Sequence, residues 1–298
     1  QLVKPTVRQV ENDNGVIIFD DTIQEKPHSK ESDLISWHYD HTKGRSVLGI
    51  NLLNCLYHTG EASIPVAYQL IEKTTHYSVI ETKKLKRKCE HTKNEYFREM
   101  LSICCHNQLK FKYVLADSWF CSNENMMYTR HKCHKHFMMA MKSNRLISLS
   151  QEDKKQGRSQ RIDSVDFSED KPIHGWISGL DFSVLFVRQV FKNKDGSEGI
   201  LYLICSDLEC DGDQIKAIYQ RRWKVEVFHK NLKSNASMAK SPAHTVLTQS
   251  NHIFMSIYST FRLEILSLKL KMNHFELRAK LYLTAIRASF EELKKLSA

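Results

Sequence analysis

Four side chains in the last third of the sequence have types and spacing suited to phosphate chemistry. Tyr219, Arg222, Glu226 and Lys233 are separated by 3, 4 and 7 residues. At about 100° per residue, they would share an arc of roughly 60° on one helix face that rises about 21 Å. Such a face places a carboxylate between phosphate-seeking cations and an aromatic ring. The same spacing also fits a solvated cationic face with a routine ion pair between Arg222 and Glu226.

Three more carboxylates are associated with predicted strands. GVIIFDDTI, from Gly15, is an apolar, β-branched run with Asp20 and Asp21 near its end, and FKYVLADSWF contains a strand that ends at Asp117. Taken singly, these acids could also cap a turn or a helix. A helix carboxylate facing strand-end carboxylates could hold two Mg²⁺ ions, which prefer oxygen ligands and assist in-line displacement at phosphorus. The sequence therefore predicts a metal-dependent phosphoryl-transfer site.

The segments around these acids predict an α/β fold. VLGINLLNCLYHTG and ASIPVAYQLIEK are strand-like, with a turn at His58–Glu61. A helix over KNEYFREMLSICCHNQ precedes the Asp117 strand, and a helix at about Ser122–Lys132 leads to the strand HFMMAM. This order is typical of a ribonuclease-H-like mixed sheet flanked by helices.

The remaining segments predict three parts. Residues 1–143 form the first part of the catalytic core, with the strands of the aspartates. Residues 144–211 form a β-rich insertion: a polar exposed loop to about Gly175, then the strands FSVLFVRQVF and GILYLICSD, joined by KNKDGSE with its Asp-Gly turn. Residues 212–298 are helical and complete the core with the helix of Glu226.

Composition favours a polyanionic partner. The 298 residues include 44 Lys and Arg against 34 Asp and Glu, giving a formal charge of +10. The basic run KKLKRK (Lys83–Lys88) predicts a solvated loop or helix face, or non-specific phosphate contacts. No apolar run is long enough for a membrane span or signal core, so we expect a soluble, cytoplasmic protein. The eight irregularly spaced cysteines predict reduced thiols, and the group around His131–His136 lacks the paired spacing of a zinc site.

Three sequence blocks resemble one protein family. The pattern Y-x2-R-x3-E-x6-K within YQRRWKVEVFHKNLKSN resembles the signature of the IS-four group of bacterial insertion-sequence transposases. IIFDDT resembles the first-Asp region of that group and VLADSWF the second-Asp region, so the resemblance covers nearly the whole chain.

The resemblance implies roles for individual residues. Asp21, which directly precedes Thr22, would form the catalytic and metal-binding triad with Asp117 and Glu226 and hold two Mg²⁺ or Mn²⁺ ions. Asp20 could share or replace the role of Asp21. The resemblance also implies that the other members of the signature contact DNA: Tyr219, Arg222 and Lys233. In the insertion, it implies that the one tryptophan, Trp176, stacks on a base.

The expected function is cut-and-paste DNA transposition. Metal-activated water would nick the transposon end, and the freed 3′-hydroxyl would attack the opposite strand or the target. The DNA partner would be double-stranded, both as the terminal inverted repeats of the transposon and as the target. A second copy of the chain would complete a homodimer on this DNA. The protein would act at the nucleoid in the cytoplasm of a bacterial cell. The alternatives are a non-catalytic, DNA-binding transposase remnant and a ribonuclease-H-like nuclease without strand transfer. Because only 20 residues precede Asp21, we expect a fragment or compromised end recognition.

Overall fold

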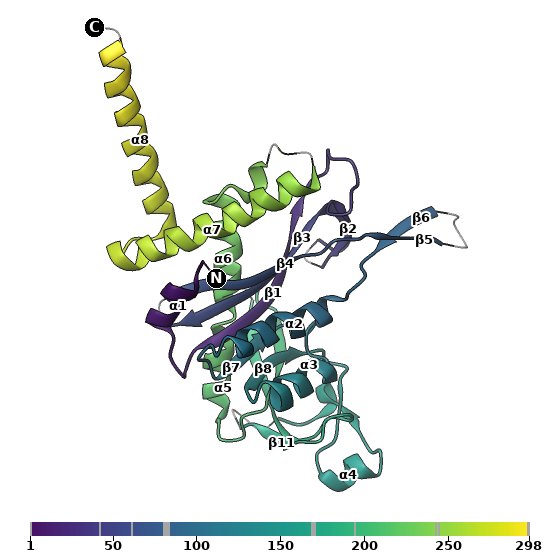
Figure 1. Cartoon of the computed structure of the whole chain (residues 1–298). Coiled ribbons are helices and arrows are strands. Elements are labelled where there is room, and N and C mark those ends of the chain that lie inside the picture. The colour runs from purple at the N-terminus through teal and green to yellow at the C-terminus, as the bar shows by residue number, and fades with distance from the viewer. Residues whose placement is uncertain are drawn as a thin grey trace.

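A large mixed sheet is the centre of the molecule. The computed structural model describes residues 2–41, 43–60, 62–79, 84–167, 171–193, 195–241, 243 and 245–296. Within these residues, nine strands form one sheet (Figure 1). In order across the sheet they are β11 (Ile173–Gly175), β12 (Val184–Lys192), β13 (Glu198–Cys205), β8 (His136–Met141), β7 (Tyr113–Ala116), β1 (Val16–Glu25), β3 (Arg45–Thr59) and β2 (Ser36–Asp40), while β4 (Ala62–Leu70) also pairs with β3.

The strand directions confirm the predicted mixed α/β fold. The strands β4, β3 and β1 form an antiparallel meander, and β7 and β8 follow parallel to β1. The hairpin of β12 and β13 lies in the predicted insertion, and β13 pairs antiparallel with β8. The hairpin therefore extends the central sheet.

Helices cover both faces of this sheet. They are α1 (Lys4–Val10), α2 (Lys93–His106), α3 (Asn123–Met127), α4 (Gln151–Lys155), α5 (Gly212–Gln220), α6 (Trp223–Ser234), α7 (Val246–Leu270) and α8 (His274–Leu296), with a π-helical turn at Tyr128–Lys132 and 3-10 turns at Ile162–Ser164 and Met238–Lys240. One buried cluster joins α2 and α3 to the sheet, and a second cluster joins α5 and α6 to it. The helix α8 extends away from the rest of the chain (Figure 1).

Several segments differ from the sequence prediction. The polar stretch 144–175 contains α4 and a two-stranded sheet of β9 (Leu146–Ile147) and β10 (Gln160–Arg161), so its prediction as a loop was wrong in part. The basic run lies largely in β6 (Lys84–Lys88), which pairs with β5 (Thr75–Val79). Glu61, Lys83 and Lys194, from the predicted turns and the basic run, lie outside the described residues.

The predicted helix of the Tyr219–Lys233 stripe is two helices. The helix α5 ends at Gln220 and α6 begins at Trp223. On one continuous helix, Phe228 would point about 180° away from Tyr219. Both side chains are nevertheless buried in the same cluster against the sheet. The break in the helix axis allows both halves to pack there.

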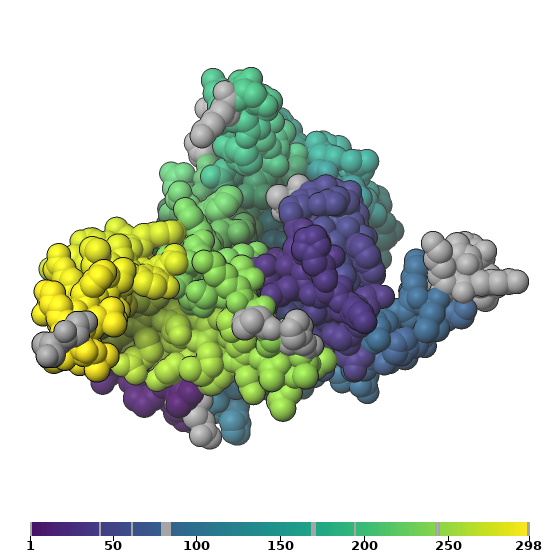
Figure 2. Space-filling model, turned by 90° about the horizontal axis from the view of Figure 1, so that it is seen from above, coloured from purple at the N-terminus to yellow at the C-terminus, as the bar shows by residue number. Residues whose placement is uncertain are grey.

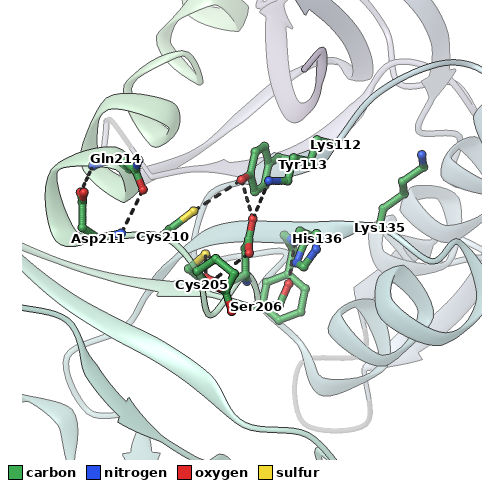
Figure 3. A network of polar contacts seen from close by, with 12 residues as sticks. Lys112, Tyr113, Lys135, His136, Cys205, Ser206, Cys210, Asp211 and Gln214 are labelled. Atoms are coloured by element: carbon green, nitrogen blue, oxygen red, sulfur yellow. Dashed lines mark hydrogen bonds and ion pairs between the residues drawn. The ribbon is translucent and has the colours of Figure 1, made fainter. Parts of the chain in front are cut away.

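A buried polar network holds the start of β7. Asp207 is 4% exposed, and its Oδ2 accepts hydrogen bonds from Tyr113 Oη at 2.6 Å and Lys112 Nζ at 2.9 Å. Figure 3 shows Lys112 and Tyr113 beside Cys210, whose Sγ lies 3.4 Å from Tyr113 Oη. The network joins the first residue of β7 to the loop between β13 and α5, while Asp117 directly follows the other end of β7.

Candidate active site

The neighbouring acids Asp20 and Asp21 lie on opposite faces of β1. Side chains point to alternate faces along a strand. Ile18 packs in the cluster of α5 and α6, and Phe19 packs in the cluster of α2, so these two residues show which face each acid occupies. Asp20 therefore faces α6, where its Oδ2 lies 3.3 Å from Arg222 Nη1. Asp21 faces α2, and its Oδ2 pairs with Lys93 Nζ at 2.7 Å.

The sheet register brings Asp117 beside Asp20. Phe19 of β1 pairs with Ala116 of the parallel strand β7, so the next residues on the two strands are the two aspartates. Asp117 follows Leu115 by two residues, and Leu115 packs in the cluster of α5 and α6. Asp20 and Asp117 therefore share the sheet face that α6 covers.

The helix α6 completes the acidic group. Ligand atoms of Asp20, Glu226 and His229 all lie within 4.8 Å of one another. The Glu226 side chain is 45% exposed and pairs with Arg222 at 3.6 Å. Glu226 can thus reach solvent and substrate while remaining next to the buried Asp20.

Two buried polar side chains, Asn54 and His229, lie next to these carboxylates. Asn54, which pairs with Asp20 across β1 and β3, lies with its Nδ2 2.9 Å from His229 Nε2. Burial, together with the charges of Lys233 and Arg222, lowers the pKa of His229 to about 3. His229 is therefore neutral near pH 7, and its Nε2 accepts the hydrogen bond from Asn54. Neither residue was predicted from the sequence.

The electrostatics of the site favour an added cation. Burial, and next the charges of Asp117 and Glu226, raise the pKa of Asp20 to about 8 against the opposing effect of Arg222. Burial also raises the pKa of Asp117. Like charges held this close are costly unless a cation compensates them.

The donor atoms fit a hard divalent cation. Asp20, Asp117 and Glu226 offer carboxylate oxygens, the ligands that Mg²⁺ and Mn²⁺ prefer. The buried side-chain oxygen of Asn54 has no hydrogen-bond partner within the described part of the chain. Among the described residues, Asp20, Glu226 and His229 lie close enough together to hold a metal ion, and the side chains at His131–His136 form no such group.

A cationic cleft surrounds the acids. Its volume is about 1310 Å³, and it contains Asp20, Asp21, Asp117 and Glu226. Six lysines and one arginine line it: Lys43, Lys73, Lys93, Lys142, Lys230, Lys233 and Arg222. Such a surface matches the phosphate backbone of a nucleic acid.

The four residues predicted to contact DNA differ in whether they line the cleft. Arg222 and Lys233 line the cleft, and Lys233 Nζ also donates to the Ile23 carbonyl at 3.0 Å. Tyr219 is 5% exposed and packs beneath Arg222, whose guanidinium carbon lies 6.0 Å from its ring centre. Trp176 lies outside the cleft lining, on the bridge to Ser148.

An exposed tryptophan beside the acids was missed in the sequence analysis. Trp119 lines the cleft, is 46% exposed, and donates its backbone N–H to Asp117 Oδ1 at 3.0 Å. Lys93 Nζ lies 5.6 Å from the Trp119 ring centre. Its position two residues after Asp117 was the signal that could have identified it.

Comparison with protein families identifies one family for the first part of the chain. The family model described as DDE superfamily endonuclease matches residues 1–171, more than half of the chain. The match includes Asp20, Asp21 and Asp117 but ends before Glu226, so the position of Glu226 rests on the structure. No curated protein is similar enough in sequence to match. Across the described residues, none of the helices has the length and apolar character needed to cross a membrane. The matched family, the strand topology and the acidic cleft lead to one conclusion: the chain belongs to the DDE superfamily of endonucleases.

Proposed function

We propose that this chain is a DNA transposase of the IS-four type, with Asp20, Asp117 and Glu226 as its metal-binding carboxylates. The observation that carries the proposal is a cleft lined by lysines in which Asp20 of β1 lies within 4.8 Å of Glu226 of α6, while Asp117 follows β7 beside Asp20 in the sheet register. Asp20 replaces Asp21 in the triad because it lies on the same sheet face as Asp117, and that face is covered by α6, which carries Glu226. Asp21 faces α2 and is paired with Lys93.

The protein residues have distinct tasks in this proposal. Two Mg²⁺ or Mn²⁺ ions on the triad would activate the attacking oxygen and stabilise the leaving oxygen at the scissile phosphate. Arg222 bridges Asp20 and Glu226 and holds both carboxylates in place. Lys230 and Lys233, on the same helix as Glu226, line the cleft where the DNA backbone would lie.

The substrate is double-stranded DNA, cut at transposon ends and joined through the 3′-hydroxyl to target DNA. We propose a homodimer assembled on paired terminal repeats. The complete Tyr-Arg-Glu-Lys pattern favours this function over that of a nuclease without strand transfer. The intact triad favours it over that of a non-catalytic remnant.

Metal-dependent nicking tests the proposed function. Wild-type protein is expected to nick supercoiled plasmid with Mn²⁺ or Mg²⁺, and Glu226→Ala is expected to lose this activity. Glu276→Ala, an exposed acid on α8 paired with Lys280, is the matched control and should retain it. With duplexes carrying the source element's terminal repeats, joined products would distinguish a transposase from a simple nuclease. DNA binding without nicking by the wild type, or undiminished nicking by Glu226→Ala, would contradict the proposal.

A second expected result concerns Trp119. Because the exposed Trp119 ring lies beside the acids, Trp119→Ala should weaken binding of a duplex with unpaired bases at the site. Stacking contributes about 1–3 kcal/mol per base, so affinity should fall by roughly five- to a hundredfold in fluorescence anisotropy. Trp176→Ala is the comparison, since Trp176 lies outside the cleft. A larger loss in Trp176→Ala than in Trp119→Ala would assign the stacking role to Trp176.

A further inference from the structure

A two-stranded ribbon projects from the wall of the acidic cleft. It consists of β5 and β6, which pair with each other and belong to a sheet separate from the central one. Figures 1 and 2 show this ribbon extending away from the body, at the opposite end of the molecule from α8. We propose that the ribbon holds duplex DNA beyond the cleft, as a second contact that rests on the proposed DNA-cutting function.

One face of the ribbon carries cations and an aromatic ring. Cross-strand partners share a face, and the register pairs Tyr77 with Lys86 and Thr75 with Lys88. All four residues are exposed, and Tyr77 is 42% exposed. The side chains of Lys86 and Lys88 have no hydrogen-bond or ion-pair partner among the residues that the structure describes. Both lysines are therefore available to phosphates.

The opposite face fixes the ribbon to the body. Arg87 points away from Lys86 and Lys88, because side chains alternate along β6. Its Nη1 pairs with Asp33 Oδ1 and also donates to the Lys73 carbonyl at 3.4 Å. The Lys73 backbone N–H donates to the Asp33 carbonyl at 2.8 Å. These bonds hold the base of the ribbon and leave the lysine face open.

The base of the ribbon is continuous with the cleft. Lys73, two residues before β5, and Cys89, directly after β6, both line the cleft. DNA bound at the acids would therefore leave the cleft beside Lys86 and Lys88. Lys86 and Lys88 are two positions apart on one strand face, which is a spacing of about 6.6 Å. This is about twice the distance of roughly 3.4 Å between successive phosphates along the axis of one DNA strand. A two-stranded ribbon also fits the major groove, which is about 12 Å wide.

Duplexes of two lengths test the ribbon contact. The full chain would be titrated onto fluorescein-labelled duplexes of about 10 and about 30 base pairs, or about one and three helical turns. Lys86→Ala/Lys88→Ala should bind the longer duplex about tenfold more weakly than wild type at about 50 mM salt. The slope of log affinity against log salt should decrease by about 2, since two phosphate contacts are lost. The loss should be greater for the longer duplex. Lys86→Gln/Lys88→Gln, which keeps side-chain length, should behave in the same way.

The control variant removes the same charge elsewhere. Lys294→Ala/Lys295→Ala changes two exposed lysines at the end of α8 and should bind like wild type. If the ribbon variants match this control in affinity and salt slope while wild type binds and nicks DNA, the ribbon proposal is overturned and the proposed function stands. If wild type binds neither duplex, both proposals are overturned.

Discussion

Asp20→Asn is expected to abolish metal-dependent nicking, with a loss of about 10³-fold or more, or about 4 kcal/mol of transition-state stabilisation. The asparagine keeps the shape of the side chain but removes a negatively charged metal ligand. Asp20 shares its sheet face with Asp117, and its ligand oxygen lies within 4.8 Å of a Glu226 oxygen. The measurement is the initial rate of plasmid nicking at saturating Mn²⁺.

Asp21→Asn is the matched comparison. The substitution makes the same chemical change one residue away, on the strand face towards α2. It removes an ion pair with Lys93 that is partly exposed, and such pairs contribute about 1 kcal/mol or less. The nicking rate should therefore fall less than about tenfold. A greater loss in Asp21→Asn than in Asp20→Asn would restore Asp21 to the triad.

Asp207→Asn is expected to destabilise the protein by about 2–3 kcal/mol. Burial alone would raise the pKa of Asp207, but hydrogen bonds from Tyr113 and Lys112 outweigh it and lower that pKa to about 2. The difference from the unfolded value of about 3.9 is almost two units, at about 1.4 kcal/mol each. Chemical denaturation at pH 7 would measure the loss.

The pH dependence of this loss has a defined sign. A folded-state pKa below the unfolded one stabilises the protein fully above about pH 4, and this contribution disappears as the pH falls towards 2. The stability difference between wild type and Asp207→Asn should therefore be constant at neutral pH and shrink between about pH 4 and pH 2. Asp213→Asn is the control, because Asp213 is exposed and lies 3.8 Å from Lys216. Equal stability of wild type and Asp207→Asn at pH 7 would show that the network contributes nothing.

The mixed sheet with flanking helices, and the strands that carry Asp20 and Asp117, could be predicted from sequence. Apolar runs before Asp20 and Asp117 identified two sheet strands, and the spacing around Glu226 identified a helix. The choice between Asp20 and Asp21 was not predictable in the same way. It depends on which face of β1 the helix α6 covers, and VIIF is buried on both faces. Alternation alone therefore could not distinguish the two acids.

Other features of the site depend on long-range packing. The Tyr219–Lys233 spacing fits one helix, but the burial of both Tyr219 and Phe228 against the sheet requires a break. The hydrogen bond between Asn54 and His229 joins residues 175 positions apart, and no local pattern signals that contact. The basic run could not be assigned to a ribbon from its own residues, because its pairing partner β5 is short and polar.

Direct measurement of Mn²⁺ binding tests the proposed metal site most closely. Free Mn²⁺ would be followed by electron paramagnetic resonance while wild-type protein, Asp20→Asn and Asp21→Asn are each titrated in the presence of DNA. The proposed site predicts that wild type and Asp21→Asn remove Mn²⁺ from solution with similar affinity, and that Asp20→Asn binds it at least about tenfold more weakly. Equal Mn²⁺ binding by Asp20→Asn and wild type would contradict the assignment of Asp20, Asp117 and Glu226 as the metal-binding triad.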